Sequence, residues 1–298
     1  MSQPLISICI PSYNRADLIE ETINSALSQT YTNIEVIIND NCSTDGTWAL
    51  LQELAKKDTR IKIFQNESNL GAVRNWKKVM GYASGAYSLI LWSDDLIKDT
   101  FIEKTLAAFD TDVAFVMTGV EEFSTEGVYY TSNFGKEGKR AKKDYYDEVL
   151  FKNTSGLPVS PSCALFRTEE LRANILDVIP NTDNIDFNRT GAGPDILTFF
   201  LTSLRYPYIY VLSEHLARFR SHPTSITTME NQIGGLKLHY DWAKYYFVKN
   251  HLQSYLQKFK AITWIRYYRY KKIHHNMLKD MRSIRTDFLF MISLFTKA

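Results

Sequence analysis

The chain has 298 residues, of which 45% are hydrophobic and 23% are charged, and its formal net charge is +2. This length suits one large domain or two small ones with an ordinary core, which excludes a disordered or fibrous chain. So small a net charge argues neither for nor against nucleic acid. We expect no nucleic-acid partner.

The cysteines and the apolar runs bear on the compartment. Cys9, Cys42 and Cys163 are far apart and form no metal-binding spacing, which favours a reducing environment. No signal-peptide pattern follows Met1, and no apolar run reaches the roughly 20 residues of a membrane-spanning helix. We therefore expect a cytoplasmic protein.

The first hundred residues alternate two periodicities. Short apolar runs predict strands, and apolar residues at helical spacing predict helices between them. The predicted strands are Leu5–Ile10, Ile34–Ile38, Ile61–Phe64 and Tyr87–Trp92, and the predicted helices are Ala16–Gln29, Thr47–Leu54 and Ala72–Ala83. This order predicts βαβ units, a parallel sheet and an α/β fold.

Polar residues follow three of these strands. They stand at residues 11–14, 39–41 and 93–95, and ligands bind at the carboxyl ends of strands in such sheets. Asp94 and Asp95 are adjacent carboxylates, which repel each other unless a cation or strong donor lies between them. A divalent metal that shares its remaining positions with substrate phosphates would suit them. The alternative is an ordinary polar turn.

The second hundred residues are less regular. Apolar runs predict strands at Val113–Val120, Ser160–Phe166 and Tyr206–Leu212, the last with a possible extension at Leu216–Phe219. Pro194 suits a helix start, which predicts a helix over Asp195–Leu204.

The segment from Glu126 to Lys143 is rich in glycine and lysine, and we expect a solvated, mobile loop there. The alternative is a lid, or a contact for an anionic acceptor. Its cationic residues are Lys136, Lys139, Arg140, Lys142 and Lys143.

The chain from Gln232 onward has helical character. Residues 257–298 hold ten Lys or Arg and two Asp, and an apolar stripe runs from Ile273 to Phe295. A basic amphipathic helix indicates contact with a membrane surface. The alternative is packing on its own domain or on another subunit in a homo-oligomer.

Five motifs in order resemble the nucleotide-binding half of family 2 glycosyltransferases, the inverting GT-A group. They are SICIPSYNR, INDNCSTDGT, NESNLGAVRN, ASGAY and WSDD, within residues 5–120. A looser resemblance to the acceptor-side half covers residues 155–225 through SPSCALFR, GAGPD and FRSHPTS. The resemblance implies a GT-A mixed sheet in residues 1–225, divided into a donor-binding half (1–120) and an acceptor-side half (121–225). It leaves residues 226–298 as a helical, basic C-terminal extension.

The resemblance also implies a nucleotide-sugar donor, with a UDP-sugar favoured, and a divalent metal, Mn²⁺ or Mg²⁺. Asp95 matches the metal ligand, and His222 stands where some members have a further metal or diphosphate contact. Asp40 matches the carboxylate that binds the uracil N–H, and Tyr13 could stack on the base. The full set of implied donor-binding residues is Pro11, Tyr13, Asn14, Asp40, Asn69, Gly71, Arg74 and Asp94.

Asp195 matches the general base of the family, which takes the proton of the acceptor hydroxyl. The alternative is a carboxylate that serves only the helix dipole, and a structural hydrogen bond is the alternative for His222. The implied activity is inverting, metal-dependent transfer of a hexosyl-type sugar to a glycan or lipid-linked acceptor. By analogy, the task is cell-surface polysaccharide or glycoconjugate synthesis, with the protein peripheral at the inner face of the membrane.

Two positions depart from the common family pattern. Trp92 and Asn39 stand where an acid is frequent, which bears on donor identity more than on activity. Two other functions stay open. A nucleotidyltransferase would need a Gly-rich, basic loop after the first strand, and residues 11–15 offer none. A non-catalytic nucleotide-sugar-binding scaffold would not need to keep both Asp95 and Asp195.

Overall fold

The computed structural model describes residues 3–132, 135–152, 156–157, 159–226, 228 and 236–269. The first part confirms the predicted βαβ pattern. Strands β1 (Ile6–Ser12), β2 (Ile34–Asp40), β3 (Ile61–Gln65) and β4 (Tyr87–Ile90) pair in parallel in the order β3-β2-β1-β4. Helices α1 (Ile19–Leu27), α2 (Thr47–Lys57) and α3 (Ala72–Gly81) connect them. The expected fourth strand ends two residues early, so Trp92 lies beyond it.

The same sheet continues through the second part of the chain. Strand β9 (Ala164–Arg167) runs antiparallel between β4 and β6 (Val113–Ser124), and β10 (Tyr208–Arg220) pairs in parallel with β6. The short β5 (Leu96–Ile97) closes the edge beside β10. The mixed sheet is the one expected, but β10 joins two predicted runs into a single strand with irregular register near His215.

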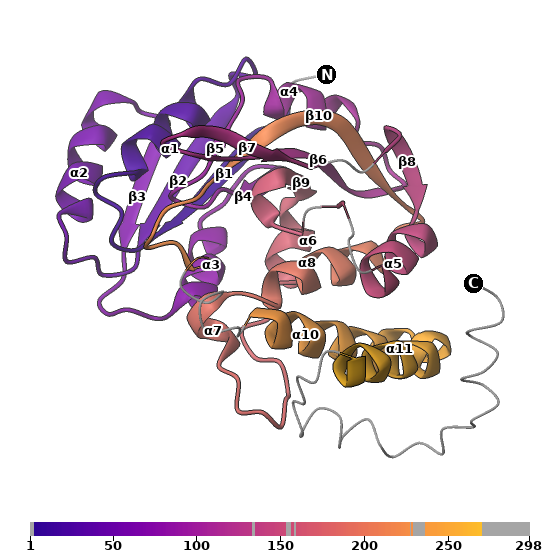
Figure 1. Ribbon diagram of the computed structural model, residues 1–298. Coiled ribbons are helices and arrows are strands. Elements are labelled where there is room, and N and C mark those ends of the chain that lie inside the picture. The colour runs from indigo at the N-terminus through magenta and orange to yellow at the C-terminus, as the bar shows by residue number, and fades with distance from the viewer. Residues whose placement is uncertain are drawn as a thin grey trace.

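Helices cover both faces of the sheet because the strand residues alternate between two apolar clusters. Ile8 and Ile10 face α1, α2 and α4 (Phe101–Ala107), whereas Cys9 faces the cluster on the opposite side. That second cluster holds α3, α5 (Lys142–Phe151), α6 (Thr168–Ala173) and α8 (Pro194–Ser203). Figure 1 shows these helices below the sheet.

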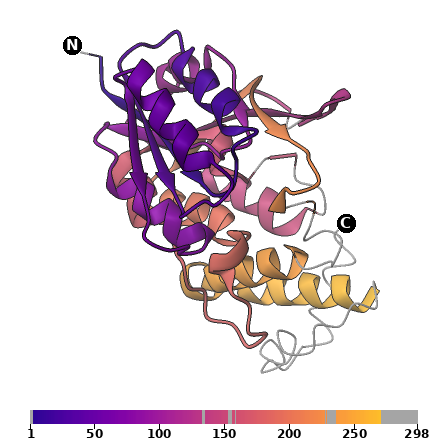
Figure 2. The ribbon, with the colours of Figure 1, turned by 90° about the vertical axis from the view of Figure 1, so that its left-hand side faces the viewer.

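The C-terminal helices form an outer layer. α10 (Leu236–His251) packs on α8, and the 3₁₀ turn η2 (Gln253–Tyr255) leads into α11 (Leu256–Arg269). Both views place α10 and α11 on the far side of α8 from the sheet (Figures 1 and 2). No helix in the described part of the chain is long and apolar enough to cross a bilayer. The apolar stripe from Ile273 to Phe295 lies outside the described residues.

The prediction of a loop over residues 126–143 is wrong, although β7 within it is solvent-exposed as expected. This segment contains β7 (Gly127–Thr131), which pairs with β6, and β8 (Gly138–Ala141), which pairs with β10, and it enters α5. Lys139 pairs with Asp110, and the Lys142 ammonium donates to the Leu204 carbonyl at 2.9 Å. The basic residues therefore anchor an added sheet edge, a pairing that charge density along the chain does not reveal.

Candidate active site

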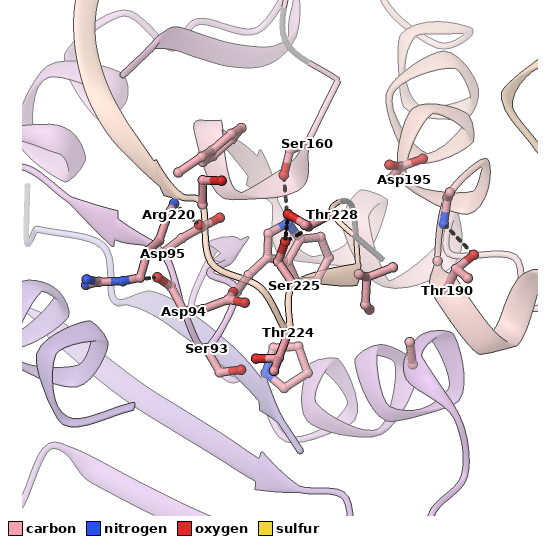
Figure 3. Close-up of a pocket in the computed structure, with 18 of the residues that line it drawn as sticks. Ser93, Asp94, Asp95, Ser160, Thr190, Asp195, Arg220, Thr224, Ser225 and Thr228 are labelled. Atoms are coloured by element: carbon pink, nitrogen blue, oxygen red, sulfur yellow. Dashed lines mark hydrogen bonds between the residues drawn. The ribbon is translucent and has the colours of Figure 1, made fainter. Parts of the chain in front are cut away.

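The carboxyl ends of the parallel strands border one cavity of about 1120 Å³. Residues that follow β1, β4 and β10 line one side, and residues of α7 (Phe187–Thr190), α8 and α10 line the other. Figure 3 shows Asp94 and Asp95 on one side of the cavity and Asp195 on the opposite side. Of the candidates from the sequence, those among the lining residues are Pro11, Tyr13, Asn14, Asn69, Gly71, Asp94, Asp95 and Asp195.

Asp94 and Asp95 occupy different environments although they are neighbours. Asp94 Oδ2 lies 3.0 Å from His222 Nε2 and 3.4 Å from Arg15 Nε. Asp95 Oδ1 accepts a 3.0 Å hydrogen bond from the backbone N–H of Arg220. The Arg220 guanidinium in turn donates to the Asp94 carbonyl at 3.0 Å. Strand β10 thus fixes both residues of the acidic pair.

Their ionisation differs accordingly. Burial opposes the charge on Asp94, but the hydrogen bond to His222 and the Arg15 guanidinium outweigh it and lower the pKa of Asp94 below its usual value. Burial and the neighbouring Asp94 charge raise the pKa of Asp95 well above its usual value. Asp95 is thus a buried carboxylate that a bound cation would stabilise in its charged form.

Asp95 fits a metal that completes its coordination with substrate. No group of three or more His, Cys, Asp or Glu side chains is placed to hold a metal ion within the ranges that the structure describes. Mg²⁺ commonly takes one or two carboxylates and fills its other positions with phosphate oxygens and water. Asp95, only 5% exposed and facing the cavity, offers such a carboxylate.

His222 is engaged through both ring nitrogens. Its Nε2 lies 3.0 Å from Asp94 Oδ2, and its Nδ1 lies 3.0 Å from the Thr224 hydroxyl. In this arrangement His222 orients Asp94, and neither nitrogen is directed to a further ligand. A metal role for His222 would require one of these bonds to break.

Asp195 begins α8 at the other side of the cavity. Its Oδ1 accepts from the backbone N–H of Gly193 at 2.8 Å and of Ile196 at 2.7 Å, and its Oδ2 accepts from the Tyr240 hydroxyl at 2.7 Å. Burial outweighs these bonds and raises the pKa of Asp195 to about 7. A carboxylate that titrates near neutral pH is suited to accept a proton from a hydroxyl.

A network of asparagines shapes the loop that precedes α3. Asn75 Oδ1 accepts from the side-chain amides of Asn39 at 2.6 Å and Asn66 at 3.0 Å, and Asn41 donates to Asn69 Oδ1 at 2.8 Å. Because Asn75 Nδ2 also donates to the Ser12 carbonyl at 3.4 Å, these amides join the ends of β1, β2 and β3 to α3. An acidic side chain at position 39, as in the common family pattern, has no N–H group to donate to Asn75 Oδ1, which explains the asparagine there.

Gly71 is required where this loop enters α3. Its φ is +84°, and a Cβ there would lie 2.2 Å from Asn188 Nδ2. Asn188 bridges the loop to α7, because its side chain donates to the Leu70 carbonyl and accepts from the Arg74 N–H. Close packing of loop against helix therefore sets this wall of the cavity.

Two predicted donor contacts do not reach the cavity with their side chains. Asp40 is fully buried and accepts from Ser43 and from Gln65 Nε2 at 3.0 Å. The Arg74 guanidinium turns outward to Asp177 at 3.2 Å. Asn41, directly after Asp40, lines the cavity instead.

Trp92 forms part of the cavity wall. Its ring lies against Trp76 with centroids 4.6 Å apart, and Trp76 packs beneath Gly191. An aromatic surface therefore stands where the family often has a carboxylate.

With this geometry established, comparison with known proteins gives the family. Residues 7–173, more than half of the chain, match the profile of Glycosyl transferase family 2. The chain belongs to this family.

Curated relatives of this glycosyltransferase are themselves named as glycosyltransferases. It is 26% identical over 245 residues to glycosyltransferase GlyG of Streptococcus pneumoniae, covering 72% of this chain and 80% of GlyG. It is 38% identical over 130 residues to UDP-Glc:alpha-D-GlcNAc-diphosphoundecaprenol beta-1,3-glucosyltransferase WfaP of Escherichia coli, covering 44% of this chain and 48% of WfaP. The chain thus spans about half of WfaP, and half or less of other curated relatives.

The fold is shared with TarS of S. aureus. The structure of TarS residues 1–349 in complex with UDP-GlcNAc superposes with a TM-score of 0.66, at 20% identity, over 90% of this chain and 73% of that one. The chain accordingly has the GT-A-like fold, a mixed sheet flanked by helices with C-terminal helices added.

Several lining residues of this glycosyltransferase were not identified from sequence. Arg15 and Arg220 are neighbours of motif residues, so their positions within SICIPSYNR and FRSHPTS were available signals. Tyr240 stands in a segment without motif resemblance, and no sequence signal marks it.

Proposed function

We propose that this family 2 glycosyltransferase transfers a sugar, with inversion, from a nucleotide-sugar donor to a hydroxyl of a glycan or lipid-linked acceptor. The carrying observation is the placement of Asp94–Asp95 and of Asp195 on opposite sides of one cavity. We favour a UDP-sugar because the fold is that of TarS, whose structure holds UDP-GlcNAc. The activity named for WfaP supports a lipid-diphosphate-linked acceptor. Similarity to TuaG of Bacillus subtilis, a putative teichuronic acid biosynthesis glycosyltransferase, supports a role in cell-surface polysaccharide synthesis.

The donor diphosphate lies at the Asp94–Asp95 side in this proposal. Asp95 would hold a Mn²⁺ or Mg²⁺ ion there, and such an ion would supply Lewis-acid stabilisation of the charge on the departing diphosphate. Asp94 is kept ionised by His222 and Arg15 and is directed to the ribose or donor sugar. The nucleoside lies along Pro11, Tyr13 and Asn41, with the half-exposed Tyr13 ring free to stack on the base.

The acceptor hydroxyl lies at the Asp195 side. Inversion requires attack from the face opposite to the leaving diphosphate, and the separation of the two acidic groups across the cavity provides that direction. Asp195 takes the proton as the hydroxyl oxygen attacks the anomeric carbon.

The proposal extends to organisation and location. Residues 1–120 supply the donor side and 121–225 much of the acceptor side, while the extension from 226 carries α10 and α11. We place the protein in the cytoplasm, peripheral at a membrane surface through the basic residues beyond 257, with self-association as the alternative use of that segment.

Calorimetry with UDP and Mn²⁺ tests the donor site. The wild type should bind UDP only with the metal present, and Asp95→Ala should abolish this metal-dependent binding. Asp112→Ala is the control, because this exposed carboxylate precedes β6 at the opposite edge of the sheet and should leave binding unchanged. Metal-dependent binding that survives in Asp95→Ala would contradict the metal assignment.

A screen of nucleotide sugars for hydrolysis or thermal stabilisation with Mn²⁺ identifies the donor, since a bound ligand raises the apparent stability.

Asp195→Asn should retain donor binding and lose transfer by roughly 10²–10⁴-fold. UDP binding without turnover of any nucleotide sugar by the wild type would favour the non-catalytic scaffold.

A further inference from the structure

The two carboxylate oxygens of Asp195 differ in how many hydrogen bonds they accept. Oδ1 accepts two, from the backbone N–H groups of Gly193 and Ile196. Oδ2 accepts one, from the Tyr240 hydroxyl at 2.7 Å. Each carboxylate oxygen has about two acceptor positions, so Oδ1 is fully used and Oδ2 retains one. The remaining acceptor position of Oδ2 is therefore on a side chain that lines the cavity.

Tyr240 comes from the outer helical layer. It stands on α10, which begins at Leu236, well beyond residue 173, where the match to the family profile ends. α10 is held firmly: Phe247 stacks on Phe200 of α8 with centroids 4.6 Å apart, and Trp242 Nε1 donates to Asp183 Oδ2 at 2.8 Å. This packing fixes the Tyr240 hydroxyl in place.

We propose that α10 is part of the catalytic centre, where Tyr240 is a positioning residue that holds the Asp195 carboxylate so that its Oδ2 receives the acceptor proton. This inference rests on the proposed role of Asp195 as general base. It assigns to the helical extension a function in the reaction, in addition to any contact with a membrane or another subunit.

The proton-transfer step balances as follows. The acceptor oxygen forms a bond to the anomeric carbon while the bond from that carbon to the diphosphate oxygen breaks, and its electron pair leaves with the nucleoside diphosphate. The acceptor proton moves to the free position of Asp195 Oδ2 and is later released to solvent. Tyr240 keeps its own proton, because burial and the Asp195 charge raise the pKa of its hydroxyl well above the usual range.

Other ionisable side chains stand on the described helices next to Asp195. From α7, Arg189 lines the cavity; from α10, the His239 ring lies edge-on to Phe187, 5.5 Å between centroids. Lys237 pairs with Asp241 at 2.6 Å. Tyr240 is the side chain that donates to Asp195, and its hydrogen bond counteracts the effect of burial.

The test compares Tyr240→Phe with Tyr246→Phe, which removes a hydroxyl from the same helix at a residue that does not line the cavity. The carboxyl carbon of Asp195 is titrated by ¹³C NMR, with its resonance assigned as the one absent in Asp195→Asn. In Tyr240→Phe the pKa of Asp195 should rise by roughly one unit, which corresponds to losing one hydrogen bond that favours the charged form. Tyr246→Phe should match the wild type.

The same variants are then assayed for turnover of whichever nucleotide sugar the donor screen identifies. In the dependence of kcat/KM on pH, the acid limb should move to higher pH in Tyr240→Phe by the same amount as the pKa of Asp195. An unchanged Asp195 titration in Tyr240→Phe, or an equal shift in Tyr246→Phe, would overturn the proposal. A shifted titration with an unmoved acid limb would instead refute Asp195 as the base. Metal-dependent UDP binding by Tyr240→Phe verifies that the variant is folded.

Discussion

The indole Nε1 of Trp92 donates a 2.7 Å hydrogen bond to the Oγ of Ser160, and Ser162 Oγ accepts from the Trp92 backbone N–H at 2.9 Å. These bonds tie Trp92, two residues before Asp94, to the turn that precedes β9. One bond comes from the indole and the other from the backbone, and the indole ring also packs on Trp76. The departure from the family pattern at position 92 is therefore built into the surrounding structure.

Restoring an acid at this position should destabilise the protein. Trp92→Phe keeps a ring and loses one hydrogen bond, which costs about 1 kcal/mol. Trp92→Asp removes the packing and adds a charge beside Asp94, which should cost about 3–5 kcal/mol. Urea unfolding followed by circular dichroism measures both, and equal stability of the two variants would contradict the packing role.

Gly191 should tolerate no side chain. Its φ is +76°, and a Cβ would lie 2.0 Å from Trp76 Cη2. Gly135 has the same φ of +76°, and a Cβ there would lie within 4 Å of no atom in the part of the chain that the structure describes. Gly135→Ala therefore isolates the backbone strain of about 1–2 kcal/mol. Gly191→Ala should cost a further ~1–3 kcal/mol from overpacking, measured by urea unfolding. Similar losses of unfolding free energy in both variants would show that the Trp76 ring moves aside without a cost in stability.

Asp195 should reduce stability at neutral pH. Burial raises its pKa in the folded protein from 3.8 to about 7, so its stabilising effect is complete below 3.8 and is lost as the pH rises to 7. In Asp195→Asn the amide oxygen can still accept from the Gly193 and Ile196 N–H groups, and the amide nitrogen can donate to the Tyr240 oxygen. This variant should therefore gain stability over wild type between pH 4 and 8, by at most about 4 kcal/mol. Urea unfolding at both pH values measures this.

The opposite trend serves as the control. The hydrogen bond from Lys77, with help from Arg74 and despite partial burial, lowers the pKa of Asp177. The stabilising contribution of the Asp177 charge is present above the usual pKa and is lost as the pH falls. Asp177→Asn lacks this contribution, so it should lose stability relative to wild type as the pH rises. The same sign for both variants would contradict the assignment of Asp195.

Truncations should separate α11 from the residues beyond it. Deleting residues 270–298 leaves α11 intact, whereas deleting 257–298 removes the buried Phe259 and the 2.6 Å bond from Arg266 to the Phe151 carbonyl. The longer deletion should lower Tm by roughly 10 °C, and the shorter one should change it little.

The shorter deletion should also abolish binding to anionic liposomes if the basic residues contact membrane. A wild type that never binds them would leave packing or self-association as their role.

The sequence by itself determined the parallel half of the sheet and the edge at which ligands bind. Strand and helix periodicities are local, and the carboxyl ends of parallel strands share one edge, so the position of Asp94 and Asp95 followed directly. The start of α8 at Pro194, which places Asp195, was equally a local signal.

Only the tertiary structure decided which side chains face the cavity and which residues partner them. Asp40 and Arg74 turn to Ser43 and Asp177, and the basic segment after Glu126 joins the sheet, because distant residues offered them partners. Tyr240 reaches Asp195 across 45 residues through the packing of α10 on α8. Periodicity records how a residue repeats with its neighbours, whereas these contacts arise when separate elements pack, and their energies do not appear in any local pattern.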